Sequence, residues 1–144
     1  MIQEFGIEEE SDEAKAYLLA RLAENISGRT LFELSKKNYI YVISSNSGDA
    51  INKVLKEFDI DCIKGILGGD VEKSKVAKIL KLKKENKGKE IFYIGDTTGD
   101  ITEAKKAKVK NIAVTWGVHS KKQLEEVKPD YIVNEPEELL SILS

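Results

Sequence analysis

The sequence predicts an α/β fold, in which helices cover a mostly parallel sheet in a Rossmann-like three-layer sandwich. Two observations support this prediction. First, apolar runs without polar alternation recur at residues 39–43, 91–94 and 111–115, and such runs are typical of strands buried on both faces of a parallel sheet. Second, each run is followed by a polar loop and then by a stretch with helical spacing. Strand and helix alternating in this way indicate parallel strands joined by helical crossovers.

The composition indicates one globular domain covering residues 1–144, and it argues against several classes of protein. Of the 144 residues 41% are hydrophobic, and the formal net charge is −2, so the chain lacks the basic excess of a nucleic-acid-binding protein. No apolar run reaches the length of a membrane span, and no basic-then-apolar leader is present. We therefore expect a cytoplasmic protein without membrane contact. Cys62 is the single cysteine, and we expect it in the core.

The first half of the chain begins with a predicted helix, because Ala14, Tyr17, Leu18 and Leu22 repeat at helical spacing. The elements predicted after it are, in order, a helix at 31–36, a strand at 39–43, a helix at 51–58 and a strand at 61–67.

The second half continues the alternation of helix and strand. Its predicted elements are, in order, a helix at 71–84, a strand at 91–94, a helix from 101, a strand at 111–115, a helix from 120 or 121 to 127, a strand at 131–133 and a helix at 135–143. Trp116 is expected to lie under the sheet rather than at the rim of a pocket, and His119 is given no role because it has no partner at metal-ligand spacing.

Two carboxylates mark a candidate metal site. The strand at 91–94 stops at Gly95, Asp96 follows, and Asp100 lies four positions further along, where helix-spaced residues begin. Open parallel sheets bind ligands at the carboxyl ends of their strands, and paired carboxylates are hard oxygen ligands suited to Mg²⁺. The alternative is that Asp100 only caps its helix and that Asp96 is an ordinary loop residue.

A polar loop and a lysine mark a candidate anion site. The loop 44–49 lies between a predicted strand and a predicted helix, and backbone N–H groups at a helix N-terminus favour an anion such as phosphate. The alternative is a capping loop with Asp49 as the N-cap. Lys75 follows Ser74 near the start of the next predicted helix, but a lysine there could equally be a solvated surface residue.

These signals occur in one order: a strand ending in Ser44, a lysine near Lys75, and the motif Gly-Asp-Thr-Thr-Gly-Asp at 95–100. In this order they resemble the haloacid dehalogenase (HAD) superfamily, especially its phosphoglycolate-phosphatase-like branch. The later stretch AKKAKVKNIAVTWGVHSKKQL adds to the resemblance, which covers roughly residues 35–143. The resemblance implies a Mg²⁺-dependent phosphatase that acts on a small phosphorylated substrate.

The resemblance also implies individual roles. Ser44 would hydrogen-bond the phosphoryl group, with further contacts from Ser45 and Asn46. Lys75 would lie against the phosphoryl oxygens, with Lys73 as the alternative because the spacing allows either. The two aspartates of the motif would hold Mg²⁺ directly or through water, and the metal would neutralise phosphoryl oxygens and orient the attack.

One motif of the superfamily is not where the resemblance requires it. The chemistry starts with Asp-x-Asp at the end of the first strand, where the first Asp attacks phosphorus and forms an aspartyl-phosphate. No such motif precedes Ser44, and the nearest match at 5–8 places Gly6 at the nucleophile position and Glu8 at the acid/base position. Residues 1–34 are therefore either a degenerate first strand with helices or the helical remnant of a cap domain.

A missing first strand would leave the centre of the sheet empty, between the strand that ends in Ser44 and the strand before Asp96. Unpaired backbone groups in a core are costly, so something must occupy this position. The candidates are residues 1–5, a direct pairing of the two neighbouring strands, or a strand from another chain, either in a homodimer or from a complementing protein.

Three functional hypotheses follow. The first is a phosphatase-like protein whose nucleophile is not in this chain, so that the isolated chain is inactive. The second is a catalytically inactive HAD-fold module that binds a partner or a phosphorylated ligand, or one part of a split enzyme. The third is a generic α/β domain without a site, which would bind neither Mg²⁺ nor phosphate.

Overall fold

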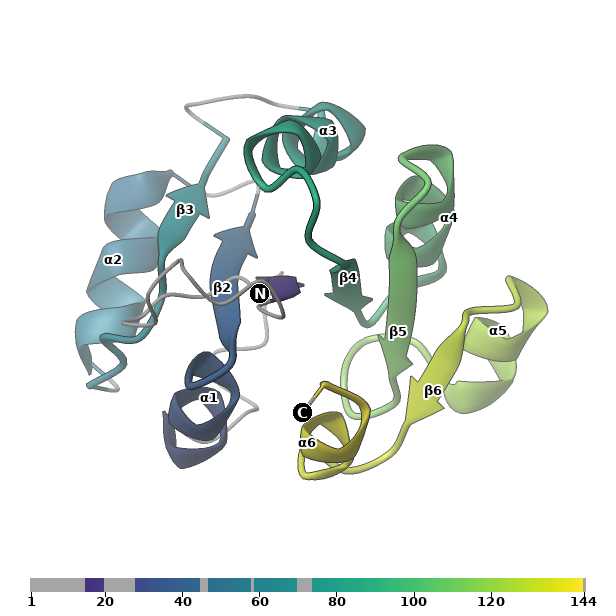
Figure 1. Ribbon diagram of the computed structural model, residues 1–144. Coiled ribbons are helices and arrows are strands. Elements are labelled where there is room, and N and C mark those ends of the chain that lie inside the picture. The colour runs from purple at the N-terminus through teal and green to yellow at the C-terminus, as the bar shows by residue number, and fades with distance from the viewer. Residues whose placement is uncertain (1–14, 20–27, 45–46, 58, 70–73, 144) are drawn as a thin grey trace.

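The computed structural model describes residues 15–19, 28–44, 47–57, 59–69 and 74–143. Strands and helices alternate strictly along this part of the chain (Figure 1). In chain order they are β1 (Lys15–Leu19), α1 (Gly28–Ser35), β2 (Asn38–Ile43), α2 (Gly48–Glu57), β3 (Gly65–Leu67), α3 (Lys75–Glu85), β4 (Ile91–Gly95), α4 (Thr98–Lys106), β5 (Lys110–Val114), α5 (Lys121–Glu126), β6 (Tyr131–Val133) and α6 (Glu138–Leu143).

The strands form one six-stranded sheet in the order β3-β2-β1-β4-β5-β6, and every neighbouring pair is parallel. Helices α3 and α4 cover one face of the sheet, while α1 and α6 pack together on the other (Figure 1). At the edges, α2 lies beside β3 and α5 beside β6. The predicted Rossmann-like three-layer α/β architecture is thus confirmed.

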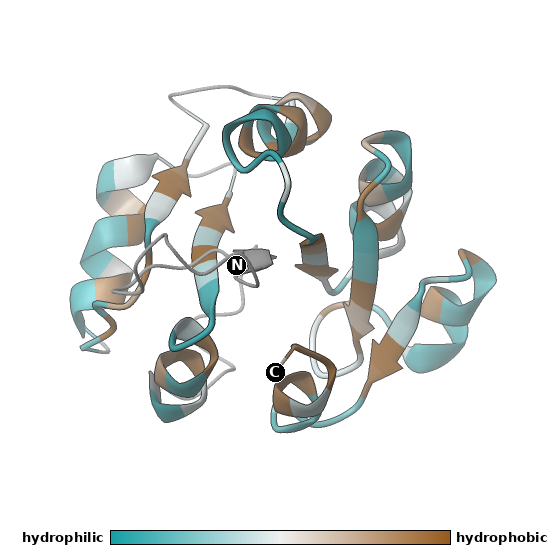
Figure 2. Cartoon of the chain, in the orientation of Figure 1, coloured by the Kyte–Doolittle hydropathy of each residue, from teal (hydrophilic) through white to brown (hydrophobic). Residues whose placement is uncertain are grey.

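The core lies on both faces of the central strands. Every residue of β2 and β4 is buried, which accounts for their continuous apolar character. Figure 2 shows hydrophobic strands inside and hydrophilic positions on the outer sides of the helices. Cys62 is buried in this core, as expected. Within the described residues, no helix has both the length and the apolar character needed to cross a membrane.

Most predicted elements are present, with shifted boundaries. The strand predicted at 61–67 is shorter, because only Gly65–Leu67 joins the sheet as β3. The helix predicted from residue 71 begins at Lys75 among the described residues, because the Ser74 side chain accepts a hydrogen bond from Ala77 N and so caps the helix there.

The helix predicted around Tyr17 and Leu18 is wrong, because this segment is the central strand β1. Its backbone pairs with β2 on one side, Tyr17 opposite Ile40, and with β4 on the other, Tyr17 opposite Phe92. The central position of the sheet is therefore filled from within the chain, and by none of the three candidates named above. Pairing on two sides satisfies the backbone groups of β1, and this tertiary requirement outweighs the helical spacing of its side chains.

The sheet order creates a topological switch point between β1 and β4. From β1 the chain proceeds to β2 and β3 on one side, whereas from β4 it proceeds to β5 and β6 on the other. The connections that leave two such strands diverge, and open α/β sheets bind ligands in the crevice outside these carboxyl ends. The loop from β4 to α4 lies at this point, and it carries Asp96.

A proline in β1 tests its central position. The change Tyr17→Pro removes a backbone N–H from a strand paired on both sides, so we expect the free energy of unfolding to fall by about 3 kcal/mol or more, measured by urea denaturation. Tyr131→Pro is the control, because Tyr131 is the first residue of the edge strand β6, where proline is better tolerated. Equal losses in the two variants would contradict the assignment of β1.

Candidate functional site

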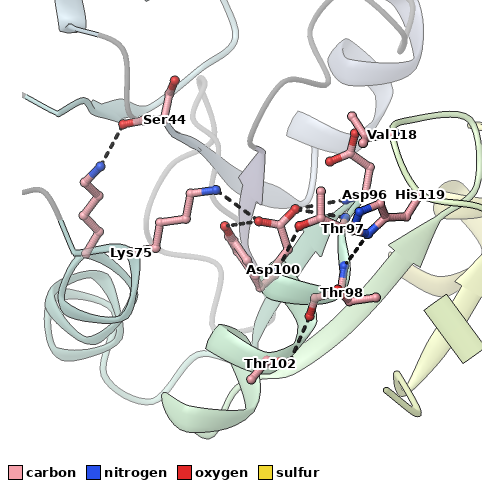
Figure 3. Close-up of polar contacts among 11 residues, drawn as sticks. Ser44, Lys75, Asp96, Thr97, Thr98, Asp100, Thr102, Val118 and His119 are labelled. Carbon is pink, nitrogen blue, oxygen red and sulfur yellow. Dashed lines mark hydrogen bonds and ion pairs between the residues drawn. The ribbon is translucent and has the colours of Figure 1, made fainter. Parts of the chain in front are cut away.

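The candidate site lies at the carboxyl edge of the sheet, where β2, β4 and the first turns of α3 and α4 meet (Figure 3). Ser44 directly follows β2, Asp96 directly follows β4, and Lys75 and Asp100 lie in the first turns of α3 and α4. Because every helix here follows a parallel strand, each helix begins at this same carboxyl edge of the sheet. The structure thus brings these four residues, which lie as far as 56 positions apart in the sequence, to one edge of the sheet.

Asp100 is the most heavily hydrogen-bonded side chain of the site. Its carboxylate is almost fully buried, with a relative exposure of 2% for the residue. Oδ2 accepts hydrogen bonds from the backbone N–H groups of Asp96 at 3.1 Å and Thr97 at 3.2 Å. Oδ1 accepts from Lys75 Nζ at 3.1 Å and from the Tyr93 hydroxyl at 3.4 Å. These four donors match the roughly four acceptor positions of a carboxylate.

The alternative role expected for Asp100, that of N-cap, is wrong in detail. Helix α4 begins at Thr98, and Thr97 is the N-cap, whose Oγ1 accepts from Asp100 N at 3.0 Å. The Asp100 carboxylate in turn accepts from Thr97 N, which completes a capping box. Asp100 therefore supports the start of its helix from the third helical position while it also contacts α3 through Lys75.

Asp96 is held by the loop between β5 and α5. The Asp96 residue is 3% exposed, and its Oδ2 accepts from Val118 N at 2.9 Å. His119 N donates to the Asp96 carbonyl at 3.1 Å. His119 Nδ1 accepts from Thr98 N at 2.9 Å, which satisfies a backbone donor at the open end of α4. His119, which sequence reasoning left unassigned, therefore fastens this loop to the start of α4.

Two glycines permit the close packing around the carboxylates. A Cβ atom on Gly95 would lie 2.3 Å from Asp100 Cβ, and one on Gly117 would lie 2.2 Å from Asp96 Oδ2. Real Cβ atoms do not come this close to other heavy atoms, so each glycine is required by the side chain that packs on it. Gly117 in particular lets the backbone of the β5–α5 loop come close enough for Val118 N to bond Asp96.

Ser44 is fixed through its backbone. Its N–H donates to Leu67 O at 3.1 Å, which continues the pairing of β2 with β3. Its carbonyl accepts from Lys78 Nζ at 2.7 Å. Sequence reasoning missed Lys78 among the many lysines; the available signal was its position three residues after Lys75, on the same helix face and directly before the apolar Ile79.

The structure brings together Lys75, Asp96 and Asp100, and it places Ser44 beside α3, the helix that carries Lys75. Several other predicted residues lie outside the described residues. They are Gly6, Glu8, Ser45, Asn46 and Lys73. Trp116, expected under the sheet, is half-buried and packs against the hydrophobic core.

An Asp-x-Asp triplet does occur after Ser44, at Asp59-Ile60-Asp61, and sequence reasoning missed it. It follows the C-terminus of α2 and precedes β3, so it lies at the amino edge of the parallel sheet. The candidate site lies at the opposite, carboxyl edge. This triplet therefore cannot supply a nucleophile beside Asp96.

The electrostatic environment combines buried acids with nearby cations. Burial raises the pKa of the Tyr93 hydroxyl well above its ordinary value, and the charges of Asp100 and Glu103 raise this pKa further. Burial likewise raises the pKa of Glu103, while the charge of Lys75 acts in the opposite direction. The N-termini of α2 and α3 add partial positive charge at the same edge.

The two aspartates are not equally suited to bind a divalent cation. Both are oxygen ligands of the kind that Mg²⁺ prefers, and they are adjacent, since Asp96 N donates to Asp100 Oδ2. Asp100 already accepts four hydrogen bonds, so it is better placed to act through water than as a direct ligand. Asp96 has a single side-chain hydrogen bond among the described contacts, and the described residues contain no cluster of three or more potential metal ligands.

Comparison with known proteins gives a consistent result. A family model described as haloacid dehalogenase-like hydrolase matches residues 3–114. The chain is 34% identical over 109 residues to a putative pyrophosphatase PpaX from Caldanaerobacter subterraneus, covering 71% of this chain and 49% of that protein. It is 31% identical over 123 residues to pyrophosphatase PpaX from Bacillus mycoides, covering 80% of this chain and 57% of that protein.

Among solved structures, a haloacid dehalogenase-like hydrolase from Streptococcus pneumoniae is similar with a TM-score of 0.73 and 26% sequence identity. The match covers 81% of this chain and 57% of that one. The chain thus spans about half the length of the curated relatives it matches.

A methyl group at Gly117 tests how closely the loop packs on Asp96. In Gly117→Ala the new Cβ would overlap Asp96 Oδ2, so we expect the free energy of unfolding to fall by about 1–3 kcal/mol and the amide of Val118 to lose protection from hydrogen exchange. Gly99→Ala is the matched control, because its Cβ would lie 3.7 Å from the nearest atom, Thr97 Oγ1. Similar losses in both variants would argue against the close contact.

The raised pKa of Tyr93 predicts a loss of stability at high pH. A phenol whose pKa is raised on folding contributes stability that is fully present below its unfolded pKa of about 10 and is lost as pH rises toward the folded value. We therefore expect Tyr93→Phe to lose less stability than the wild type between about pH 8 and pH 11, measured by urea unfolding. Tyr131→Phe, at the exposed edge strand, should lose stability with pH as the wild type does. An equally reduced loss in Tyr131→Phe would contradict the assignment of the effect to Tyr93.

Proposed function

Because the chain belongs to the haloacid dehalogenase-like hydrolase family, we propose that it is a Mg²⁺-dependent phosphatase-type domain. Its substrate is a small phosphorylated metabolite, and its nucleophilic aspartate comes from outside this chain. The relatives named pyrophosphatase make pyrophosphate a candidate substrate beside phosphate monoesters, since both present a terminal phosphoryl group.

One observation carries this proposal: an ammonium group and two buried carboxylates meet at the switch point of a parallel sheet. Lys75 contacts Asp100, and Asp100 contacts the backbone of Asp96. A structural ion pair would need only one carboxylate, and a helix cap would need no lysine. Cations, acids and helix N-termini at one edge suit a ligand that is itself an anion paired with a metal ion.

In the proposed site each side chain has a defined task. Asp96 would hold Mg²⁺, with Asp100 acting through water and orienting the loop. When bound, the metal would offset the negative charge of the phosphoryl oxygens. Lys75 would share its charge between Asp100 and the phosphoryl group, and Ser44 would donate its hydroxyl to a phosphoryl oxygen. Bound in this way, the phosphorus would face the carboxyl end of β1.

The sequence after β1 supports an external nucleophile. The residues that directly follow this central strand are Ala20, Arg21 and Leu22, and none of them carries a carboxylate. An aspartyl-phosphate requires an aspartate. Turnover would therefore need an Asp-x-Asp segment from a complementing chain, placed beside the carboxyl end of β1.

The same observation favours a second candidate function, that of a binding module without catalysis. Such a module would bind a phosphorylated ligand through Lys75 and Ser44 and release it unchanged. The two functions share the anion site and differ only in whether a complementing chain with an Asp-x-Asp segment exists.

Binding of inorganic phosphate in the presence of MgCl₂ tests the proposed site. We expect calorimetry to show binding by the wild type, with Asp96→Asn at least about tenfold weaker, a difference of about 1.4 kcal/mol. Asp61→Asn is the charge-matched control, because Asp61 is exposed at the amino edge of the sheet. We also expect no Mg²⁺-dependent hydrolysis of a chromogenic phosphate ester by the isolated chain.

Two results would overturn this proposal in different ways. If the wild type binds neither Mg²⁺ nor phosphate, the chain is a generic α/β domain without a site. If the isolated chain turns over the ester and Asp96→Asn abolishes that turnover, the nucleophile lies within this chain and the external aspartate is wrong.

A further inference from the structure

Lys78 is a buried lysine at the edge of the candidate site. It lies one turn after Lys75 in α3 and is 0% exposed. Its Nζ donates to the carbonyl oxygen of Ser44 at 2.7 Å, a short hydrogen bond. The next buried positions of α3, Ile79 and Leu82, are apolar, as expected for a helix face that packs on a sheet.

A lysine at this position is costly for a purely structural role. Taking an ammonium group out of water costs several kcal/mol unless hydrogen bonds and opposite charges compensate. A leucine or methionine would fill similar space without that cost. The hydrogen bond to Ser44 O and the nearby charge of Glu103 offset part of this cost, and the first of these contacts holds the carboxyl end of β2.

The two lysines of α3 connect strands that are not neighbours. Lys78 contacts Ser44 after β2, whereas Lys75 contacts Asp100 after β4. Strand β1 separates β2 from β4 in the sheet, so no backbone ladder fixes the distance between their carboxyl ends directly. The first turns of α3 span this gap and hold both ends.

We propose that Lys78 is a positioning residue, which fixes the Ser44 carbonyl so that the Ser44 hydroxyl and the Lys75 ammonium keep one separation for a phosphoryl group. This inference rests on the proposed phosphate site. With the Ser44 N–H bonded to Leu67 O and its carbonyl bonded to Lys78, both backbone groups of Ser44 are constrained. Lys78 does not touch the phosphoryl group; it acts through Ser44.

Matched lysine variants of α3 test the proposal. Lys78→Met keeps the apolar stem and removes the donor. Lys83→Met is the control, because Lys83 Nζ also donates to backbone carbonyls, those of Ala107 and Lys108 at 3.2 Å, but far from Ser44. We expect Lys78→Met to weaken phosphate binding with MgCl₂ at least about tenfold and Lys83→Met to change it by less than about twofold. Hydrogen exchange of the Ser44 amide should accelerate only in Lys78→Met.

The outcomes separate this inference from the proposed function. Unchanged phosphate affinity in a folded Lys78→Met variant overturns the positioning role. If the wild type does not bind phosphate, the proposed function fails. Hydrogen exchange of the Ser44 amide then decides whether Lys78 still fixes the end of β2. An exchange rate that is unchanged in Lys78→Met overturns this structural role as well.

A measurement on the wild type covers the case in which Lys78→Met does not fold. A buried, hydrogen-bonded ammonium exchanges its protons slowly enough for its ¹⁵N resonance to be followed by NMR. Added phosphate with MgCl₂ should shift the Lys78 Nζ signal and leave the Lys83 Nζ signal in place. A Lys78 signal that does not respond while phosphate binds would overturn the proposal.

Discussion

The hydrogen bonds of the Asp100 carboxylate are the interactions on which the rest of the carboxyl edge of the sheet depends. It accepts hydrogen bonds from the backbone of the β4–α4 loop, from Tyr93 within β4 and from Lys75 at the start of α3. Three elements are thereby held by one side chain. This arrangement requires that residue 95 have no side chain, because Asp100 lies directly on Gly95. A change in any of these partners would therefore alter the contacts of both α3 and α4.

A second set of contacts holds the loops of the proposed site together. The β5–α5 loop reaches back to Asp96 through Val118 N and His119 N, and the His119 ring holds Thr98 N. Groups held in this way need little rearrangement when a charged ligand binds, which is the basis of electrostatic preorganisation. These contacts already pair the buried polar groups of the loop, so the proposed binding role rests on the meeting of Lys75, Asp96 and Asp100 at one edge of the sheet.

The sequence pattern predicted the layers of the fold and most of the elements that meet at the carboxyl edge of the sheet. Strands buried on both faces and helices with one apolar face have strong local signals. The motif with Asp96 and Asp100 could be found because the two acids lie only four positions apart in the sequence. The strand at Tyr17 could not be found, since its side chains follow helical spacing and only its pairing with β2 and β4 makes it a strand. Lys78 and His119 were missed for a related reason: their partners lie 34 and 21 positions away in the sequence.

The position of β1 has a consequence for how the chain acquires its structure. Ala16 pairs with Ile91, about 75 positions later, so a nascent polypeptide releases β1 from the ribosome well before its second partner has been synthesised. Contacts of such long range slow folding, since loop closure must precede the gain from pairing. Until β4 emerges, the middle of the future sheet presents an open hydrogen-bonding edge, and this interval is when the protein is most exposed to aggregation.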